Sequence, residues 1–194
     1  MANRVILITG TPCVGKTTAA KQLAAHLKAQ YINLTELAKK YDLTLSEDKQ
    51  RHTTIINEQK MKTKLTNIIE TAKNDIIIDG HYATAVTPKQ KTTHVFVLRR
   101  NPTQLREFME KCGFKNQKLW ENLASEILDV SLIEALHEQD KTKICELDTT
   151  DKTPTQIVDE ILAILENHKA CRFGSIDWLG MLEQKGKLEE YLKI

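Results

Sequence analysis

The sequence predicts an α/β fold in which helices flank a parallel sheet. Apolar runs rich in β-branched residues occur at 4–9, 75–79 and 93–98, and such runs are typical of strands that are buried on both faces. Segments with helical spacing of apolar residues lie between these runs, and this alternation indicates a layered α/β architecture. A chain of 194 residues can form one domain with a sizeable core.

Two weaker strands would extend the sheet. The segment 143–147 (Lys-Ile-Cys-Glu-Leu) and the short segment 31–33 (Tyr-Ile-Asn) carry the same signal over fewer residues. The polar segment 33–57 has little periodicity, so we interpret it as an insertion beside the sheet.

Helices are predicted where apolar residues recur every three to four positions. The clearest are 19–27, 61–72 and 105–112, and a long helix packed on two sides is expected over 115–138. In the third, Phe108 and Cys112 complete an apolar stripe with Leu105 and Met109, which predicts core positions for them. Asn101-Pro102-Thr103-Gln104 and Thr153-Pro154-Thr155-Gln156 carry the capping residue, proline and glutamine that mark helix starts.

The last 25 residues follow a short break at 171–175 and have helical spacing. Their apolar residues Trp178, Leu182 and Tyr191 either cover the core or form a surface for a partner. We expect a helical appendage at 170–194.

The composition excludes several classes of protein. Charged residues make up 28% and the net charge is +2, which does not indicate a strongly basic nucleic-acid-binding surface, although Arg99, Arg100 and Arg106 could form a local patch. No apolar run approaches the roughly 20 residues that span a bilayer, and no signal peptide is recognisable, so a cytoplasmic location is expected. The four cysteines are far apart and form no Cys-x-x-Cys pair, which predicts reduced thiols with neither a zinc site nor a disulfide framework.

The pattern Gly10-x-x-x-x-Gly15-Lys16-Thr17 follows the first strand and opens the first helix. This context is the one that a phosphate-binding loop requires, and it disfavours a surface loop that happens to contain glycines. Lys16 would reach the β- and γ-phosphates of a nucleotide, and the Thr17 hydroxyl would ligate Mg²⁺. Thr18 can add a phosphate contact.

The segment Ile76-Ile77-Ile78-Asp79-Gly80-His81 would supply the second half of such a site. The carboxyl end of a buried strand would bring Asp79 to the crevice where open α/β sheets bind ligands. There Asp79 could hold Mg²⁺ through water or orient the transferring group. His81 could position a hydrolytic water or contact a phosphate; the alternative is a solvent-exposed turn histidine.

The loop 147–154 lies between the last strand and the last helix of the sheet unit. Its backbone could clasp a nucleotide base. An ordinary capped connection is an equally good interpretation.

These motifs, together with Val95-Phe96-Val97-Leu98-Arg99, Gly113-Phe114, Glu121-Asn122 and Glu126, resemble the adenylate kinase isoenzyme 6 family in its archaeal form. The resemblance runs over residues 1 to about 168. It implies a P-loop NTPase fold of the nucleoside monophosphate kinase type, with a five-stranded parallel sheet over 1–169. It also implies an AMP-side insertion at 33–56, a short lid at 111–121 and an added helical extension at 170–194.

The resemblance further implies an adenylate kinase (ATP + AMP to 2 ADP) with ATPase activity that uses Mg²⁺ and acts in maturation of the small ribosomal subunit. The implied partners are ATP, ADP, AMP and a platform ribosomal protein of that subunit, with contact to pre-rRNA left open. The implied catalytic residues are Lys16, Asp79 and His81, and the metal would lie at Thr17 and Asp79. The implied nucleotide-binding residues are Gly10, Cys13, Gly15, Lys16, Thr17, Thr18, Arg106 and Lys152 for ATP, with Lys39 on the AMP side.

Some positions depart from the family pattern. Cys13 stands where members usually have glycine, and its thiol suggests the hypothesis that ATP binding is sensitive to oxidation. Phe108 and Cys112 stand where members typically have arginines, so Arg106, Lys111 or Lys115 would have to compensate. Lys39 replaces an arginine and cannot grip phosphate in a bidentate manner. A nucleotide-binding module with negligible catalysis therefore remains an alternative to the enzyme.

Overall fold

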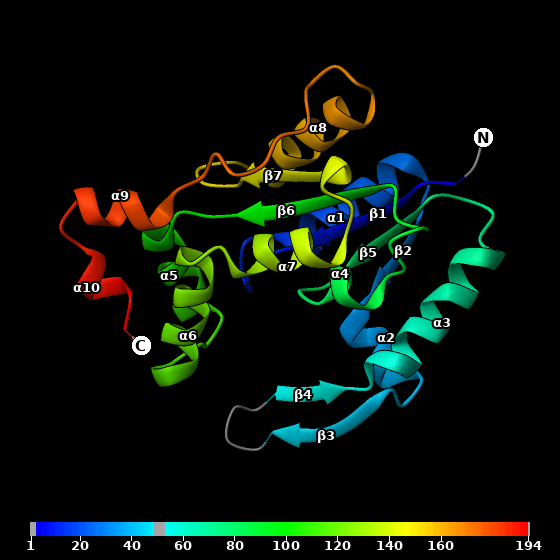
Figure 1. The fold of residues 1–194 in the computed structure, drawn as a ribbon, viewed down its shortest axis with the longest axis horizontal. Coiled ribbons are helices and arrows are strands. Elements are labelled where there is room, and N and C mark those ends of the chain that lie inside the picture. Colours follow the sequence, from blue (N-terminus) through cyan, green and yellow to red (C-terminus); the bar gives the residue numbers. More distant parts are fainter. Residues whose placement is uncertain (1–2, 49–52, 194) are drawn as a thin grey trace.

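The computed structural model describes residues 3–48 and 53–193 and contains the predicted sheet (Figure 1). Five parallel strands are arranged in the order β2-β5-β1-β6-β7. Their bounds are β1 Val5–Thr9, β2 Gln30–Asn33, β5 Ile76–Asp79, β6 His94–Arg99 and β7 Ile144–Asp148. All five predicted strands, including the two weak ones, are therefore confirmed.

The strand register places polar residues at one edge of the sheet. Asn33 pairs with Asp79 across β2 and β5, and Asp79 pairs with Ile8 across β5 and β1. Because the strands are parallel, their carboxyl ends meet at this edge, where open α/β sheets bind ligands.

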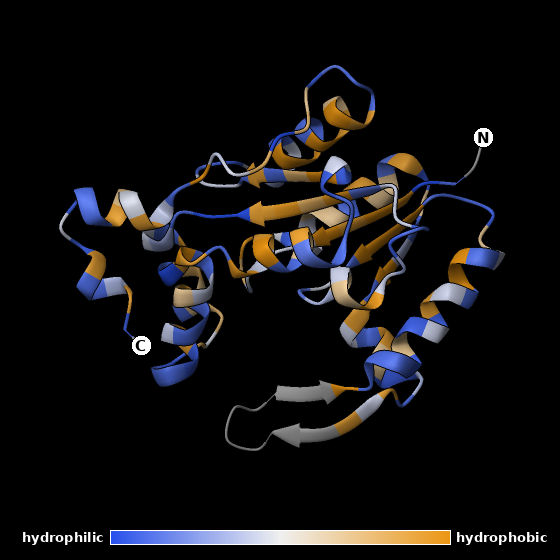
Figure 2. Ribbon diagram, in the orientation of Figure 1, coloured by the Kyte–Doolittle hydropathy of each residue, from blue (hydrophilic) through white to orange (hydrophobic). Residues whose placement is uncertain are grey.

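Helices cover both faces of the sheet and bury its apolar residues (Figure 2). One face packs against α1 Lys16–Leu27, α5 Pro102–Lys111, α6 Asn116–Ile127 and α8 Pro154–Leu165. The other packs against α2 Leu34–Lys40, α3 Glu58–Thr71, α4 Ala83–Val86 and α7 Val130–Glu138. Alternate residues of each strand enter the two clusters, as the pleat of a strand buried on both faces requires.

The two predicted helix starts are confirmed. The Asn101 side chain accepts a hydrogen bond from the Thr103 N–H at the start of α5, and Thr153 forms a capping box with Gln156 at the start of α8. Pro102 and Pro154 occupy the first turn of these helices, where a missing N–H costs nothing.

The insertion between β2 and α3 contains α2 and a hairpin, β3 Thr44–Asp48 and β4 Thr53–Ile56. The two strands pair antiparallel and form a separate sheet that projects from the body (Figure 1). The sequence predicts an insertion here but not its hairpin, because the segment 33–57 shows little alternation of apolar and polar residues.

The expected long helix over 115–138 is wrong, since the chain breaks between α6 and α7. Leu128 ends α6, and Asp129 adopts a left-handed conformation with φ 57°. The Asp129 carboxylate forms an ion pair with Arg99 at 2.5 Å. This tertiary contact holds a conformation that interrupts the helix, and the apolar periodicity of the sequence does not record it.

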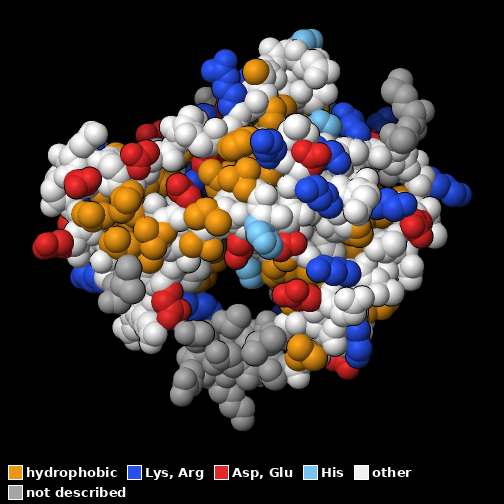
Figure 3. All heavy atoms as spheres, viewed as in Figure 1, with side chains coloured by type: hydrophobic (Ala, Val, Ile, Leu, Met, Phe, Trp, Pro, Cys, Tyr) orange, Lys and Arg blue, Asp and Glu red, His pale blue; other side chains and the backbone are white. Residues whose placement is uncertain are grey.

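The C-terminal segment folds back onto the body as α9 Trp178–Gln184 and α10 Leu188–Tyr191. Leu182 and Tyr191 pack with Ile127 of α6, and Trp178 is also buried. Of the two alternatives for these side chains, the structure therefore shows the one in which they cover the core. Apolar side chains also gather on the outside of this tail, on the face drawn in Figure 3.

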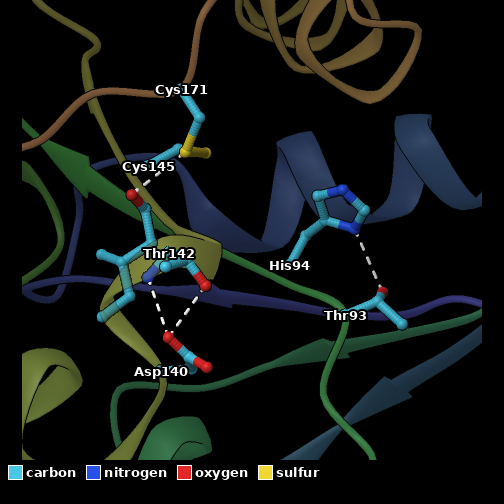
Figure 4. The surroundings of a disulfide bond; sticks show 7 residues. Thr93, His94, Asp140, Thr142, Cys145 and Cys171 are labelled. Atoms are coloured by element: carbon cyan, nitrogen blue, oxygen red, sulfur yellow. Dashed lines mark hydrogen bonds between the residues drawn. A yellow bond between two sulfur atoms is a disulfide. The ribbon is translucent and has the colours of Figure 1, made fainter.

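The prediction of four reduced cysteines is wrong for two of them. Cys145 of β7 and Cys171 form a disulfide with Cα atoms 5.0 Å apart (Figure 4). After α8 the chain returns along the open edge of β7, where the Glu146 N–H donates to the Arg172 carbonyl at 2.8 Å. This pairing brings together two cysteines that are 26 residues apart in the sequence. Cys13 and Cys112 are free thiols.

Within the described residues no helix is both long and apolar enough to cross a membrane. A short 3-10 turn, η1 Lys141–Lys143, leads into β7.

Candidate active site

The phosphate loop connects β1 to α1 in the conformation that its glycines permit. Gly10 has φ 135° and Gly15 has φ 104°, which L side chains rarely adopt. A Cβ atom on Gly10 would lie 2.3 Å from the Leu98 carbonyl oxygen. Both motif glycines are therefore required by the backbone, and α1 presents its positive N-terminal end to the loop.

Cys13 adopts a left-handed conformation with φ 67° in the same loop. Glycine reaches this region without strain, whereas a residue with a Cβ atom reaches it at some cost. Burial, together with a hydrogen bond to the Cys112 thiol, raises the pKa of Cys13 to about 12. Because the thiolate is the reactive form, this shift works against rapid oxidation of Cys13.

Lys16 lies at the centre of the loop. Its Nζ atom donates a hydrogen bond to the Thr11 carbonyl at 2.8 Å. Burial lowers its pKa to about 8, while the carboxylates of Asp79 and Glu126 act in the opposite direction. The ammonium group is thus held at a site that an incoming anion would stabilise.

Asp79 ends β5 beside the first turn of α1 and is 1% exposed. Its Oδ2 atom accepts hydrogen bonds from Thr17 Oγ1 at 2.7 Å, Tyr31 Oη at 2.9 Å and Asn33 Nδ2 at 2.9 Å. These three donors fix the carboxylate against the phosphate loop.

The donor set of Thr17 and Asp79 fits Mg²⁺. Mg²⁺ prefers oxygen ligands, keeps several waters and is usually bound by one or two protein groups together with substrate phosphates. One hydroxyl and one carboxylate, hydrogen-bonded to each other beside the phosphate loop, meet that requirement. No group of three or more His, Cys, Asp or Glu residues in the described ranges could form an all-protein metal cage.

His81 follows β5 and remains exposed beside Lys16 and Asp79. Desolvation by its surroundings, followed by the charge of Lys16, lowers its pKa to about 4, whereas Asp79 opposes the shift. The ring packs edge-on against Tyr82 with centroids 4.8 Å apart. The imidazole is therefore neutral near pH 7 and can both accept and donate a hydrogen bond.

A pocket of about 390 Å³ opens beside the phosphate loop. Five of the predicted ATP-site residues contribute to its lining on the loop side, and Lys152 contributes from the loop before α8. The complete lining is Cys13, Gly15, Lys16, Thr17, Thr18, Arg100, Phe108, Cys112, Lys152, Pro154 and Ile157.

Phe108 and Cys112 do not occupy core positions, contrary to the sequence-based interpretation. Leu105 and Met109 are fully buried, but Phe108 is 39% exposed and Cys112 is also exposed, and both line the pocket. Residues 108 and 112 are one helical turn apart, on a face beside that of 105 and 109. The apolar stripe of α5 thus continues from the core into the wall of the pocket.

Arg100 lines the pocket and was not singled out as a site residue from the sequence. Its guanidinium lies 4.6 Å from the centroid of the Phe108 ring. Its Nε and Nη1 atoms donate to Thr149 at 3.2 Å and to Gln104 at 3.0 Å. The only sequence signal was its place directly after a buried strand, at the edge that carries the site.

The structure places two predicted residues away from this pocket. Arg106 pairs with Glu110 and with Glu190 of the tail at 3.0 and 3.2 Å. Lys39 is exposed near the end of α2, on the insertion side of the sheet. The pocket therefore obtains its arginine from Arg100 rather than from Arg106.

The loop 147–154 supports the phosphate loop directly. Thr149 is fully buried, and its Oγ1 atom lies within hydrogen-bond distance of two carbonyl acceptors, that of Val14 at 3.0 Å and that of Arg99 at 2.8 Å. Lys152, farther along this loop, lines the pocket and pairs with Glu160 at 2.6 Å. The connection 147–154 is more than an ordinary capped turn, because it contacts the phosphate loop and forms one wall of the pocket.

Solved structures share this fold at low sequence identity. Shikimate kinase from Bacteroides thetaiotaomicron superposes with a TM-score of 0.59 at 16% identity, covering 84% of this chain and 98% of that one. Thymidylate kinase from Candida albicans superposes with a TM-score of 0.54 at 17% identity, covering 91% of this chain and 97% of that one. The fold is thus that of phosphate-loop kinases.

Proteins related by sequence share a higher identity with this chain than these two solved structures do. A protein of Methanocaldococcus jannaschii named "Putative adenylate kinase" is 40% identical over 173 residues, which cover 89% of this chain and 92% of that protein. A protein of Saccharolobus solfataricus with the same name is 37% identical over 190 residues, covering 98% and 95%. A family described as the AAA domain matches residues 6–129. The chain therefore belongs to the AAA domain family and, over nearly its whole length, to the family formed by these proteins named "Putative adenylate kinase".

Proposed function

We propose that the protein is an adenylate kinase-like enzyme that transfers the γ-phosphoryl group of ATP to AMP, and to water when AMP is absent. The observation that carries this proposal is the convergence of Lys16, Thr17 and Asp79 at the carboxyl edge of the sheet. The names of the relatives support it, since proteins 34–40% identical to this chain are named "Putative adenylate kinase".

ATP would bind along the phosphate loop into the adjoining pocket. The loop N–H groups and the N-terminus of α1 would hold the phosphates, and Lys16 would contact the β- and γ-phosphoryl oxygens. The adenine would enter between Arg100, Phe108 and Lys152, where a cation and an aromatic ring offer stacking surfaces.

Thr17 and Asp79 would hold Mg²⁺, Thr17 directly and Asp79 through water. When bound, Mg²⁺ neutralises charge that develops on the transferring phosphoryl oxygens. The hydrogen bonds from Tyr31 and Asn33 keep the Asp79 carboxylate oriented before the nucleotide arrives. Such preorganisation is a principal source of catalysis in phosphoryl transfer.

The acceptor would approach from the side of the insertion, with Lys39 contributing positive charge for AMP. His81 is neutral and exposed beside Lys16, so it can orient the acceptor oxygen or a hydrolytic water by hydrogen bonding. The segment 33–56 would act as the AMP-binding unit, and the segment 111–121, which leads from the end of α5 into α6, would act as a short lid.

We also propose that this activity serves maturation of the small ribosomal subunit, through binding of a platform ribosomal protein and contact with pre-rRNA. The support is the resemblance of the motifs to the adenylate kinase isoenzyme 6 family. Pull-down with the platform protein tests it: binding that depends on the bound nucleotide is expected, and absence of binding in the ATP, ADP and free states contradicts it.

The competing candidate is a nucleotide-binding module with negligible catalysis, because Phe108 and Cys112 replace lid arginines. Arg100 in the pocket weakens that alternative, since it supplies a cation on the same wall. ADP formation from Mg-ATP, with and without AMP, separates the two. AMP-dependent ADP formation supports the kinase, AMP-independent phosphate release supports hydrolysis, and neither in a protein that binds ATP supports the module.

A further inference from the structure

The carboxylate of Glu126 connects three parts of the chain in the interior. It lies on α6 and is 1% exposed. Its Oε2 atom accepts a hydrogen bond from Thr11 Oγ1 of the phosphate loop at 2.5 Å. Its Oε1 atom accepts from Arg99 Nε at 2.8 Å, from the Arg100 backbone N–H at 3.0 Å and from the indole Nε1–H of Trp178 in the tail at 3.0 Å.

This arrangement continues to the phosphate-binding lysine. Thr11 is 3% exposed, and its carbonyl accepts the hydrogen bond of Lys16 Nζ at 2.8 Å. Hydrogen bonds therefore connect the C-terminal segment to the phosphate loop. They run from Trp178 to Glu126, from Thr11 to the same carboxylate, and from Lys16 to the Thr11 carbonyl. The negative charge of Glu126 also favours the charged form of Lys16.

The electrostatic balance around Arg99 shows why the tail donor matters. The buried Arg99 guanidinium faces three carboxylates, those of Glu126, Asp129 and Glu146. One guanidinium cannot satisfy all of their oxygens, and an unsatisfied buried carboxylate oxygen is costly.

The tail supplies further donors. The Trp178 indole gives Glu126 Oε1 a third donor beside Arg99 Nε and the Arg100 N–H. The backbone N–H groups of Gly174 and Ser175 donate to Glu146 Oε2 at 2.9 and 3.3 Å. Two of the three carboxylates around Arg99 therefore accept hydrogen bonds from residues 174–178.

We infer that Trp178 is a positioning residue for phosphoryl transfer, and that the C-terminal segment completes the phosphate site by fixing Glu126 and, through it, Thr11 and Lys16. This inference rests on the proposed function, in which Lys16 binds the phosphates of ATP. The tail is then a part of the site rather than an appendage that only covers α6.

The test is a double-mutant cycle between Trp178→Phe and Thr11→Val. Trp178→Phe removes the indole N–H and retains an aromatic ring, while Thr11→Val breaks the next hydrogen bond at the loop. Each single change is expected to weaken Mg-ATP binding and lower kcat at saturating ATP by about threefold to tenfold, which corresponds to the net contribution of one typical hydrogen bond. Because both act through one carboxylate, the double variant should lose less than the product of the two effects.

Tyr191→Phe is the matched control. Tyr191 lies on α10 of the same tail, and its buried ring packs with Ile127 and Leu182. This change removes one hydroxyl and keeps the ring, so ATP affinity and kcat should be unchanged. Thermal unfolding is recorded for all variants, and the kinetics are measured well below every midpoint.

The outcomes separate the inference from the function on which it rests. If Trp178→Phe lowers the midpoint but leaves ATP affinity and kcat unchanged, or if the two changes combine multiplicatively, Trp178 does not position the loop. Should Trp178→Phe not fold, Glu126→Gln against Thr11→Val gives the same cycle from the central residue. If Lys16→Ala retains full ATP binding and turnover, the proposed function itself is wrong.

Discussion

The lowered pKa of Lys16 predicts a loss of ATP affinity in mildly alkaline solution. Lys16 is protonated below its pKa of about 8 and neutral above it in the free protein. The phosphates of ATP favour the charged form, so binding above this pH requires uptake of a proton. One unit above the pKa only about one molecule in ten carries the charge, and Mg-ATP affinity should fall roughly tenfold, or about 1.4 kcal/mol.

Isothermal titration with Mg²⁺ and a non-hydrolysable ATP analogue, from about pH 7 to about pH 9.5, measures this effect. The pKa values of Cys13 and Tyr31 are raised to about 12, so these two neighbours do not ionise in that range. Lys16→Arg is the control, because a guanidinium keeps its charge throughout. Constant affinity of the native protein across the range, or an equal alkaline loss in Lys16→Arg, would refute the reasoning.

Three further predictions concern the loop, the metal and the disulfide. Gly10→Ala places a Cβ atom 2.3 Å from the Leu98 carbonyl and should cost about 2 kcal/mol or more in urea unfolding; an unchanged midpoint would contradict the loop geometry. Asp79→Asn should lower Mg²⁺-dependent turnover by at least about tenfold and raise the Mg²⁺ concentration for half-maximal rate, and unaltered Mg²⁺ dependence would remove Asp79 from the metal site. Replacing Cys145 and Cys171, which are 26 residues apart, by serine should lower the free energy of unfolding by about 3.5 kcal/mol on the loop-entropy model, whereas equal stability with and without reductant in the native protein would argue against the bond.

The sheet and the phosphate loop could be predicted from the sequence because their signals are local. A strand buried on both faces is a continuous apolar run, and the loop needs glycines, a lysine and a hydroxyl at fixed spacing. Asp79 was identifiable for the same reason, since it ends such a run.

The remaining features depend on contacts between distant residues. Arg100 enters the pocket because β6 ends beside the phosphate loop, and Cys145 meets Cys171 because the chain returns along β7. The break at Asp129 depends on Arg99, which is 30 residues away. Local periodicity does not encode such pairs, so Phe108 and Cys112 were assigned to the core although they face the pocket.

The most direct test of the central claim follows the γ-phosphoryl group itself. The protein is incubated with Mg²⁺, AMP and ATP labelled in the γ-phosphate, and the label is traced in ADP and in free phosphate. We predict label in ADP when AMP is present, label in free phosphate when it is absent, and neither product with Lys16→Ala. Two results would contradict a phosphoryl-transfer site built on Lys16, Thr17 and Asp79. In one, the native protein places label in neither ADP nor free phosphate; in the other, Lys16→Ala transfers label as well as the native protein does.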